Sequence, residues 1–170
     1  VALAGRMGRT VDHLAELAGD ILAFGRPTPL RREPVRLGEL IRECLGMLED
    51  RIVAQGIVVE TSLDAFPEQI ALDPREVRKA VVNFIVNALD AMPDGGTLSV
   101  EGRMPDAGTV EIAFRDTGCG MSAETLERLF ELFYTTKAQG TGLGMAIARQ
   151  AVERHGGELN VASKIGLGTQ

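Results

Sequence analysis

Apolar residues at helical spacing predict a long helix near the start of the chain, over residues 3–24. The stripe consists of Val11, Leu14, Leu17, Ala18, Ile21 and Phe24. Apolar positions three and four apart share one face of a helix, and a stripe this wide is typical of a helical bundle. Prolines at positions 27 and 29 end the helix. We therefore predict a helix and linker over residues 1–29 and a second domain over residues 30–170.

The second region alternates between helical and strand patterns. The predicted helices cover residues 37–55, 74–92, 123–132 and 144–155, and the predicted strands cover residues 57–63, 69–72, 98–103, 109–116 and 158–163. Asp73 is placed to cap the helix that Pro74 opens, and Glu76 is placed to reach back to the cap. Helices that alternate loosely with hairpin strands predict an α/β fold, a two-layer sandwich with helices on one face of a mixed sheet.

Composition narrows the function classes. The chain has 170 residues, 45% of them apolar, which suffices for one domain with a core and a short appendage. A net charge of −6 without a long basic run argues against a nucleic-acid groove. Two cysteines form no metal or disulfide framework and fit a reduced, cytoplasmic setting. No apolar run approaches the roughly 20 residues that span a bilayer. The chain begins with valine, so we expect a piece of a longer protein.

Polar residues form a stripe on the predicted helix over residues 74–92. Asn83, Asn87 and Asp90 stand at positions i, i+4 and i+7, beside an apolar track. Asparagine is unfavourable inside helices, and its amide oxygen, like a carboxylate, suits Mg²⁺. The stripe therefore indicates either a metal-phosphate site or a solvated polar edge.

The predicted strand over residues 109–116 ends on a carboxylate. Asp116 follows Val110, Ile112 and Phe114 at alternate positions, so all four side chains point to one face. A carboxylate turned toward the apolar side needs hydrogen-bond donors, and the amino group of adenine is a suitable one. The alternative is that Asp116 only caps the following turn through backbone N–H groups.

A glycine-rich segment, "QGTGLGMA", precedes the last predicted helix. Such a turn either binds phosphate through its N–H groups or is a plain turn. Lys137, just before it, either pairs with a phosphate as a point charge or lies solvated on the surface. The dinucleotide pattern fails because Ile147 stands where a glycine is needed. The Walker pattern fails because no Gly-Lys-Ser/Thr follows.

Five motifs, in order, resemble those of the sensor histidine kinase catalytic domain. They are "NFIVNALDAM", "DTGCGM", "LFELFYTTK", "GTGLGMA" and "GLGT", which correspond to the N, G1, F and G2 boxes and a fifth element. The resemblance covers residues from about 30 to the end of the chain. It implies an ATP-binding Bergerat fold related to those of gyrase B, Hsp90 and MutL. The segment "LAGDILAFGRP" resembles the end of the dimerisation and phosphotransfer domain that precedes this fold in the family.

The resemblance also implies roles for individual residues. Asp116 is expected to bind the adenine amino group, Asn87 to ligate Mg²⁺, and Asn83 and Lys137 to act on the γ-phosphate as catalytic residues. The segment 132–141 corresponds to the ATP lid. The implied nucleotide-binding set is Asn83, Asn87, Asp90, Asp116, Gly118, Gly120, Lys137, Gly140, Thr141, Gly142, Leu143, Gly144 and Thr169.

The implied reaction is transfer of the ATP γ-phosphate to a histidine on a phosphotransfer helix absent from this chain. His13 lies on the wrong helix to be the acceptor, and His155 suits a structural place at a helix end, where the helix dipole favours it. We therefore expect that the chain does not autophosphorylate alone. The implied partners are the acceptor helix, a response regulator receiver domain and, in the full-length parent, a second copy. We expect a cytoplasmic domain, and the pattern leaves open whether the parent is anchored to a membrane.

One position separates the kinase from rival functions. ATPases of this superfamily carry a glutamate as general base four residues before the metal-binding asparagine, and here that position is Asn83. A neutral amide cannot take the proton, which disfavours a gyrase- or Hsp90-type ATPase. Two further functions stay open, a serine-directed switch kinase and a non-catalytic module that binds a response regulator. The predicted bundle helix argues against the switch kinase.

Overall fold

The computed structural model describes residues 29–137 and 140–170, which form a two-layer α/β sandwich. The predicted bundle helix over residues 3–24 lies outside this range. The helices are α2 (Leu37–Met47), α3 (Glu49–Ala54), α4 (Pro74–Ala91), α5 (Ala123–Arg128) and α6 (Gly144–Arg154). The strands are β1 (Glu33–Val35), β2 (Ile57–Ser62), β3 (Ile70–Leu72), β4 (Gly96–Asp106), β5 (Thr109–Asp116), β6 (Ser163–Lys164) and β7 (Gly168–Thr169).

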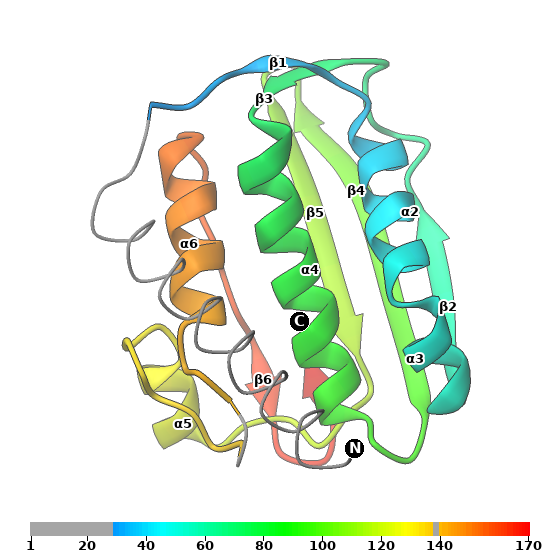
Figure 1. The fold of residues 1–170 in the computed structure, drawn as a ribbon, viewed down its shortest axis with the longest axis vertical. Coiled ribbons are helices and arrows are strands. Elements are labelled where there is room, and N and C mark those ends of the chain that lie inside the picture. Colours follow the sequence, from blue (N-terminus) through cyan, green and yellow to red (C-terminus); the bar gives the residue numbers. More distant parts are fainter. Residues whose placement is uncertain (1–28, 138–139) are drawn as a thin grey trace, which may run out of the picture.

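The main sheet has the strand order β2-β4-β5-β7-β6. Strand β2 runs parallel to β4, and the other pairs are antiparallel, so the sheet is mixed as predicted. Helices α2, α4 and α6 lie side by side over one face of it (Figure 1). A second sheet, in which β1 pairs with β3, was not predicted. No helix within residues 29–137 and 140–170 has both the length and the hydropathy needed to cross a membrane.

The core lies between this sheet and α4, the longest described helix. Leu98 and Val100 of β4 and Ile85 and Leu89 of α4 are fully buried, together with Ile41 of α2. Burial of these side chains is the main favourable term for the fold. It fixes α4 across the middle of the sheet, between α2 and α6 (Figure 1), so that both ends of α4 hold defined positions.

Two predicted helices differ in the structure. The helix predicted over residues 37–55 is divided at Leu48, because its last turn tightens: the Leu48 N–H donates to the oxygen of Leu45, three residues back, at 3.1 Å. The helix predicted over residues 123–132 ends at Arg128. After it, Phe133 has a positive φ of 66° and its N–H donates to Gly142 at 3.0 Å, so a tertiary contact replaces a further helical turn.

The strands also differ from prediction at two places. The first strand of the hairpin, β4, extends to Asp106 instead of ending at residue 103, and its register with β5 shifts between Arg103 and Asp106. The predicted strand over residues 158–163 forms only at its end. Ser163 belongs to β6, and Ala162 before it exchanges two backbone hydrogen bonds of 2.8 Å with Gln170.

Candidate nucleotide-binding site

The N-terminal end of α4 sets the direction of the helix that carries the polar stripe. Asp73 caps it as predicted, and its Oδ1 accepts the Arg75 N–H at 3.1 Å. The predicted reach of Glu76 back to the cap is wrong: its carboxylate pairs with Lys79 at 3.3 Å and with Arg154 of α6 at 3.1 Å. Glu76 therefore ties α4 to α6 instead of closing a capping box.

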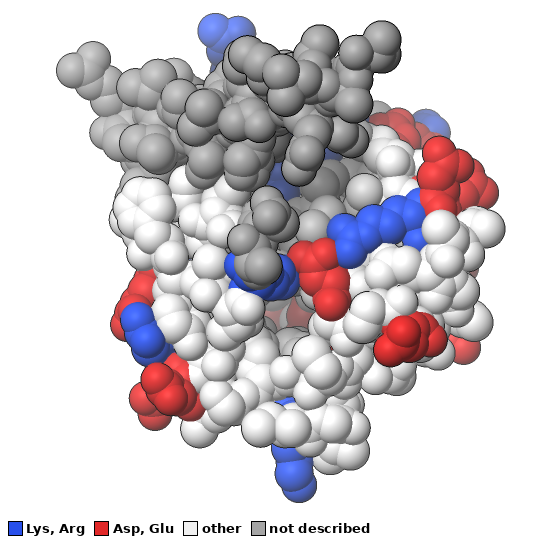
Figure 2. Space-filling view, turned by 60° about the horizontal axis from the view of Figure 1, so that its bottom comes forward, with Lys and Arg blue, Asp and Glu red and all other residues white. Residues whose placement is uncertain are grey.

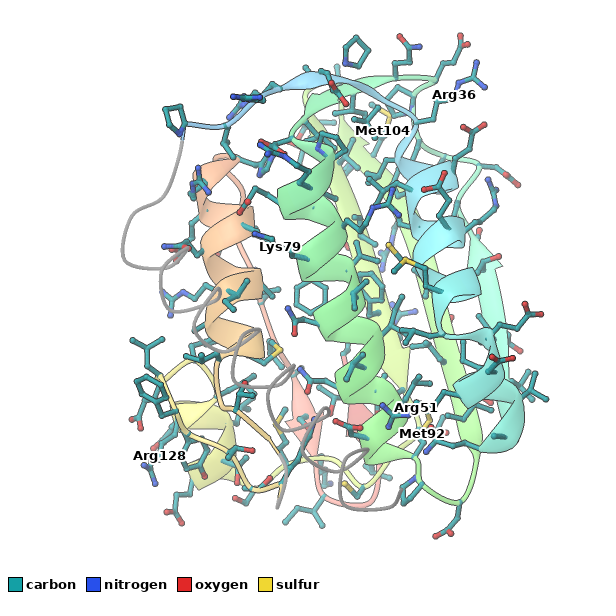
Figure 3. All side chains as sticks on the ribbon, viewed as in Figure 1. Arg36, Arg51, Lys79, Met92, Met104 and Arg128 are labelled. Atoms are coloured by element: carbon teal, nitrogen blue, oxygen red, sulfur yellow. The ribbon has the colours of Figure 1, made fainter. Side chains whose placement is uncertain are left out.

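Three charged side chains from different elements meet at the C-terminal end of α4. Lys137 donates to Asn87 Oδ1 at 2.5 Å and pairs with Asp90 Oδ2. Arg51 of α3 pairs with Asp90 Oδ1, and Figure 3 shows Arg51 beside the last turns of α4, near Met92. Burial alone would raise the pKa of the Asp90 carboxyl, but its hydrogen bonds and ion pairs with Lys137 and Arg51 lower it. Asp90 is therefore an anion held between two cations.

The side chains of this cluster are partly exposed, at the end of the molecule that Figure 2 turns forward. Figure 2 shows basic and acidic side chains in contact near the middle of this face, beside a hollow in the uncharged surface. The Lys137 and Asp90 side chains are 40% and 26% exposed. Water therefore reaches the cluster, and its partners can be exchanged.

Asn83 stands apart from the other two members of the stripe. Its Nδ2 donates to the backbone oxygen of Lys79 at 3.0 Å. Its Oδ1 faces the first turn of α6, and a Cβ added at Gly144 would lie 2.5 Å from it. The stripe is thus divided between two neighbours, the start of α6 and Lys137.

The glycines of "GTGLG" all lie against protein atoms. A Cβ at Gly140 would overlap Thr135 Oγ1, and one at Gly142, whose φ is 69°, would overlap the Phe133 backbone. Thr141 Oγ1 accepts the Leu143 N–H at 3.2 Å, and the Leu143 side chain is buried. Close packing within the protein is therefore sufficient to explain these glycines, and binding of phosphate by this loop stays a prediction.

The turn after β5 docks onto the end of α4. A Cβ at Gly118 would lie 2.6 Å from the backbone oxygen of Ala91, and the Cys119 N–H donates to that oxygen at 3.0 Å. Gly120 has a φ of 65° and lies against the Lys164 backbone. Because this turn is fixed to α4, it holds Asp116 at a set position beside the end of the helix.

Asp116 has the orientation that the alternation predicts, with Val110, Ile112 and Phe114 packed on the core. Its Oδ1 accepts the Gly118 N–H at 2.9 Å, and the backbone of Thr169 also donates to the carboxylate. The turn-capping alternative is therefore present in the structure. Burial nevertheless raises the pKa of the Asp116 carboxyl, and the two backbone donors offset this only partly. An additional donor, such as an amino group, would lower the cost of burying this charge.

Arg51 is the member of the site that the sequence did not reveal. It is 39 positions from Asp90 and lies on another helix. Its neighbours fix it: Arg51 Nε donates to Gln55 at 3.0 Å, and Gln55 donates to the Leu89 oxygen at 3.2 Å. The one local signal in the sequence was the four-residue spacing of Arg51 and Gln55. This spacing does not identify Asp90 as a partner of Arg51.

The donor set at the end of α4 fits a hard cation. No group of three or more histidine, cysteine or acidic side chains within residues 29–137 and 140–170 could hold a metal ion. Asn87 and Asp90, however, turn one oxygen each toward the Lys137 ammonium. Mg²⁺ is usually held by one or two protein oxygens while it keeps waters and binds phosphates. These residues therefore fit Mg²⁺ that arrives with a nucleotide.

Comparison with known proteins defines the family. Residues 72–170 match the family described as histidine kinase-, DNA gyrase B-, and HSP90-like ATPases. The match covers α4, the turn that holds Asp116 and more than half of the chain. The chain belongs to this family.

Individual relatives of this chain are named as kinases. Sensor histidine kinase ZraS of Escherichia coli (strain K12) is 35% identical over 98% of this chain and 36% of its own length. Sporulation kinase E of Bacillus subtilis (strain 168) is 31% identical over 94% of this chain and 22% of its own. The chain thus spans about a third or less of these relatives.

Solved structures agree with the fold. Full-length ShkA in complex with AMPPNP is 28% identical, with a TM-score of 0.83 over 95% of this chain and 35% of its own. The catalytic domain of histidine kinase ThkA is 28% identical, with a TM-score of 0.69 over 82% of this chain and 91% of its own. The described residues have the fold of the ATP-binding catalytic domain of sensor histidine kinases.

Proposed function

We propose that this domain binds Mg-ATP at the C-terminal end of α4 and transfers the γ-phosphate to a histidine of a phosphotransfer helix. The observation that carries the proposal is the meeting of Asn87, Asp90 and Lys137 next to the turn that holds Asp116. The ShkA complex with AMPPNP and the kinases among the relatives support it.

Each group has a separate task in this proposal. The Asn87 amide oxygen holds Mg²⁺, and the Lys137 ammonium neutralises charge on the phosphates. Asp116 accepts a hydrogen bond from the adenine amino group, since a carboxylate can accept more than two donors. Phosphoryl transfer needs mainly positioning and charge neutralisation, and these residues supply both.

The contacts of the Asn83 side chain favour transfer over hydrolysis. Asn83 Nδ2 is engaged with the Lys79 oxygen, and its amide cannot accept a proton from water at neutral pH. The phosphoryl group therefore goes to an external nucleophile that another domain activates. We infer that residues 1–29 belong to the dimerisation and phosphotransfer region. The parent then acts as a homodimer with a cytoplasmic catalytic domain and passes phosphate to a response regulator.

Calorimetric titration tests nucleotide binding. The chain is expected to bind Mg-ATP and Mg-ADP and to discriminate against GTP, because guanine has a carbonyl where adenine has its amino group. Asp116→Asn is expected to weaken ATP binding, since the amide can present a donor to that amino group. Equal affinity for ATP and GTP would remove the adenine role of Asp116.

A transfer assay tests the reaction. The chain alone is expected not to autophosphorylate, whereas it should slowly label a separately supplied phosphotransfer domain that carries the acceptor histidine. Acid-labile phosphate on this chain alone would contradict the assignment of His13 as a non-acceptor.

Phosphate release tests the hydrolase alternative. Wild-type turnover of ATP is expected to be slow, and Asn83→Glu is expected to raise it by less than the roughly 10²–10⁴-fold that general-base catalysis usually gives. Asn83→Gln is the matched control, because it lengthens the side chain without a carboxylate. Wild-type hydrolysis at ordinary enzyme rates would support the hydrolase instead.

A further inference from the structure

The cation at the end of α4 is supplied by the protein itself. The Lys137 ammonium contacts one oxygen of Asn87 and one of Asp90. They are one side-chain oxygen from each residue, and the other carboxylate oxygen of Asp90 is paired with Arg51. An ammonium and a divalent metal ion both need such oxygens, and one cation excludes the other from the same pair.

We propose that Asp90 is a second cation ligand beside Asn87, and that Lys137 is the resident cation until a metal-nucleotide complex replaces it. The nucleotide part rests on the function proposed above. In the exchange, Asn87 and Asp90 release the ammonium and take the divalent ion. Lys137 exchanges a carboxylate for a phosphate oxygen. Every charge keeps a partner, and no bond is made or broken in the protein.

Arg51 is a positioning residue in this exchange. It pairs with Oδ1 of Asp90, while Lys137 pairs with Oδ2. The Asp90 carboxylate therefore keeps its orientation when Lys137 leaves, because Arg51 is itself anchored through Gln55 to the Leu89 oxygen. Arg51 also neutralises part of the charge of Asp90. One lysine is therefore enough to balance the remaining charge before the nucleotide binds, and no permanently bound metal ion is needed.

Mn²⁺ binding without nucleotide tests the exchange directly, with the free ion followed by electron paramagnetic resonance. Lys137→Gln is expected to tighten Mn²⁺ binding roughly twofold to fivefold, which corresponds to the loss of one partly exposed ion pair. Lys79→Gln is the matched control: Lys79 lies on α4 well above Arg51 in Figure 3 and pairs with Glu76, so Mn²⁺ binding should not change. Equal Mn²⁺ affinity in wild type and Lys137→Gln would overturn the proposal.

A double variant tests Asp90 as the ligand. Asp90→Asn combined with Lys137→Gln is expected to lose the gain in Mn²⁺ affinity, whereas the exposed Asp94→Asn combined with Lys137→Gln is expected to keep it. Retention of the gain without Asp90 would also overturn the proposal. Circular dichroism of each variant verifies the fold.

ATP titration of the wild type distinguishes the two proposals. Failure to bind ATP would contradict the proposed function, while the Mn²⁺ series would still decide whether Lys137 and a divalent ion exchange.

Discussion

The two ends of α4 both carry an aspartate, and the two carboxylates have opposite surroundings. Asp73 is 1% exposed, and backbone N–H groups of Arg31, Arg75 and Glu76 point at it. Asp90 is 26% exposed, and its partners are the long side chains of Arg51 and Lys137. Backbone donors cannot leave without local unfolding, whereas side chains can rotate away. The first end is built for stability and the second for exchange.

His155 belongs to the stable end. Its Nε2 accepts the Asp73 N–H at 3.0 Å, so its proton lies on Nδ1, which donates to the Ala151 oxygen at 2.7 Å. The structural role expected for His155 therefore rests on hydrogen bonds that join α6 to α4.

The largest effect is expected from Asp73→Ala. The change removes the helix cap and leaves buried N–H groups without an acceptor, so we expect a loss of about 3 kcal/mol in unfolding free energy. Urea denaturation at pH 7 measures it. Asp64→Ala, at a side chain that is 99% exposed, is the control and should lie near wild type.

The pH dependence of this stability should be specific to Asp73. Burial alone would raise the pKa of this carboxyl, but its backbone and side-chain donors lower it from 3.8 to about 2. A lowered pKa contributes stability that is complete above about pH 4 and is lost as the pH falls toward 2. The contribution is about 2 kcal/mol. The difference in unfolding free energy between wild type and Asp73→Asn should shrink as the pH falls from about 4 toward 2. A difference that stays constant would contradict the assignment.

A smaller loss is expected from Gly118→Ala, at the exchangeable end. The added methyl group meets the backbone oxygen of Ala91, which cannot rotate away, so we expect a cost of about 1–3 kcal/mol. A loss of this size would show that the backbone is held as firmly at the C-terminal end of α4 as at the N-terminal end. Only the side chains at the C-terminal end would then exchange partners. Thermal unfolding measures the loss, and an unchanged melting temperature would show that the turn is not docked on α4.

The smallest effect, with the opposite sign, is expected from Gly46→Ala. Gly46 lies in the last turns of α2, and among the described residues no atom beyond its chain neighbours and its own helix backbone would lie within 4 Å of an added Cβ. Alanine is favoured over glycine in helices by about 0.5–1 kcal/mol, so the variant should be more stable than wild type by up to that amount. Destabilisation in urea would indicate that this turn needs the freedom of glycine.

The two ends of α4 also differ in how much of them could be predicted from the sequence. Local patterns sufficed for α4, its Asp73 cap and the orientation of Asp116, because period and capping are properties of neighbouring residues. The break at Leu48 and the early end of α5 depend on contacts across the fold. Arg51 could not be inferred, since its pairing with Asp90 arises only after α3 packs beside α4.

The loop glycines show a different limit. Their spacing predicted either a phosphate-binding turn or a plain turn, and in the structure atoms of Thr135, Phe133 and Asn83 lie close to them. A glycine pattern indicates that other atoms lie close to the backbone, but it does not identify those atoms. The phosphate role of these positions therefore depends on binding experiments.

Hydrogen exchange with and without Mg-ATP tests the central claim, that nucleotide binds at the C-terminal end of α4, most directly. We predict slower exchange in segments 87–92, 116–120 and 140–145, with no change in segments 73–79 and 150–155. Slower exchange confined to the Asp73 end, or no change at the Asp90 end at saturating nucleotide, would contradict it.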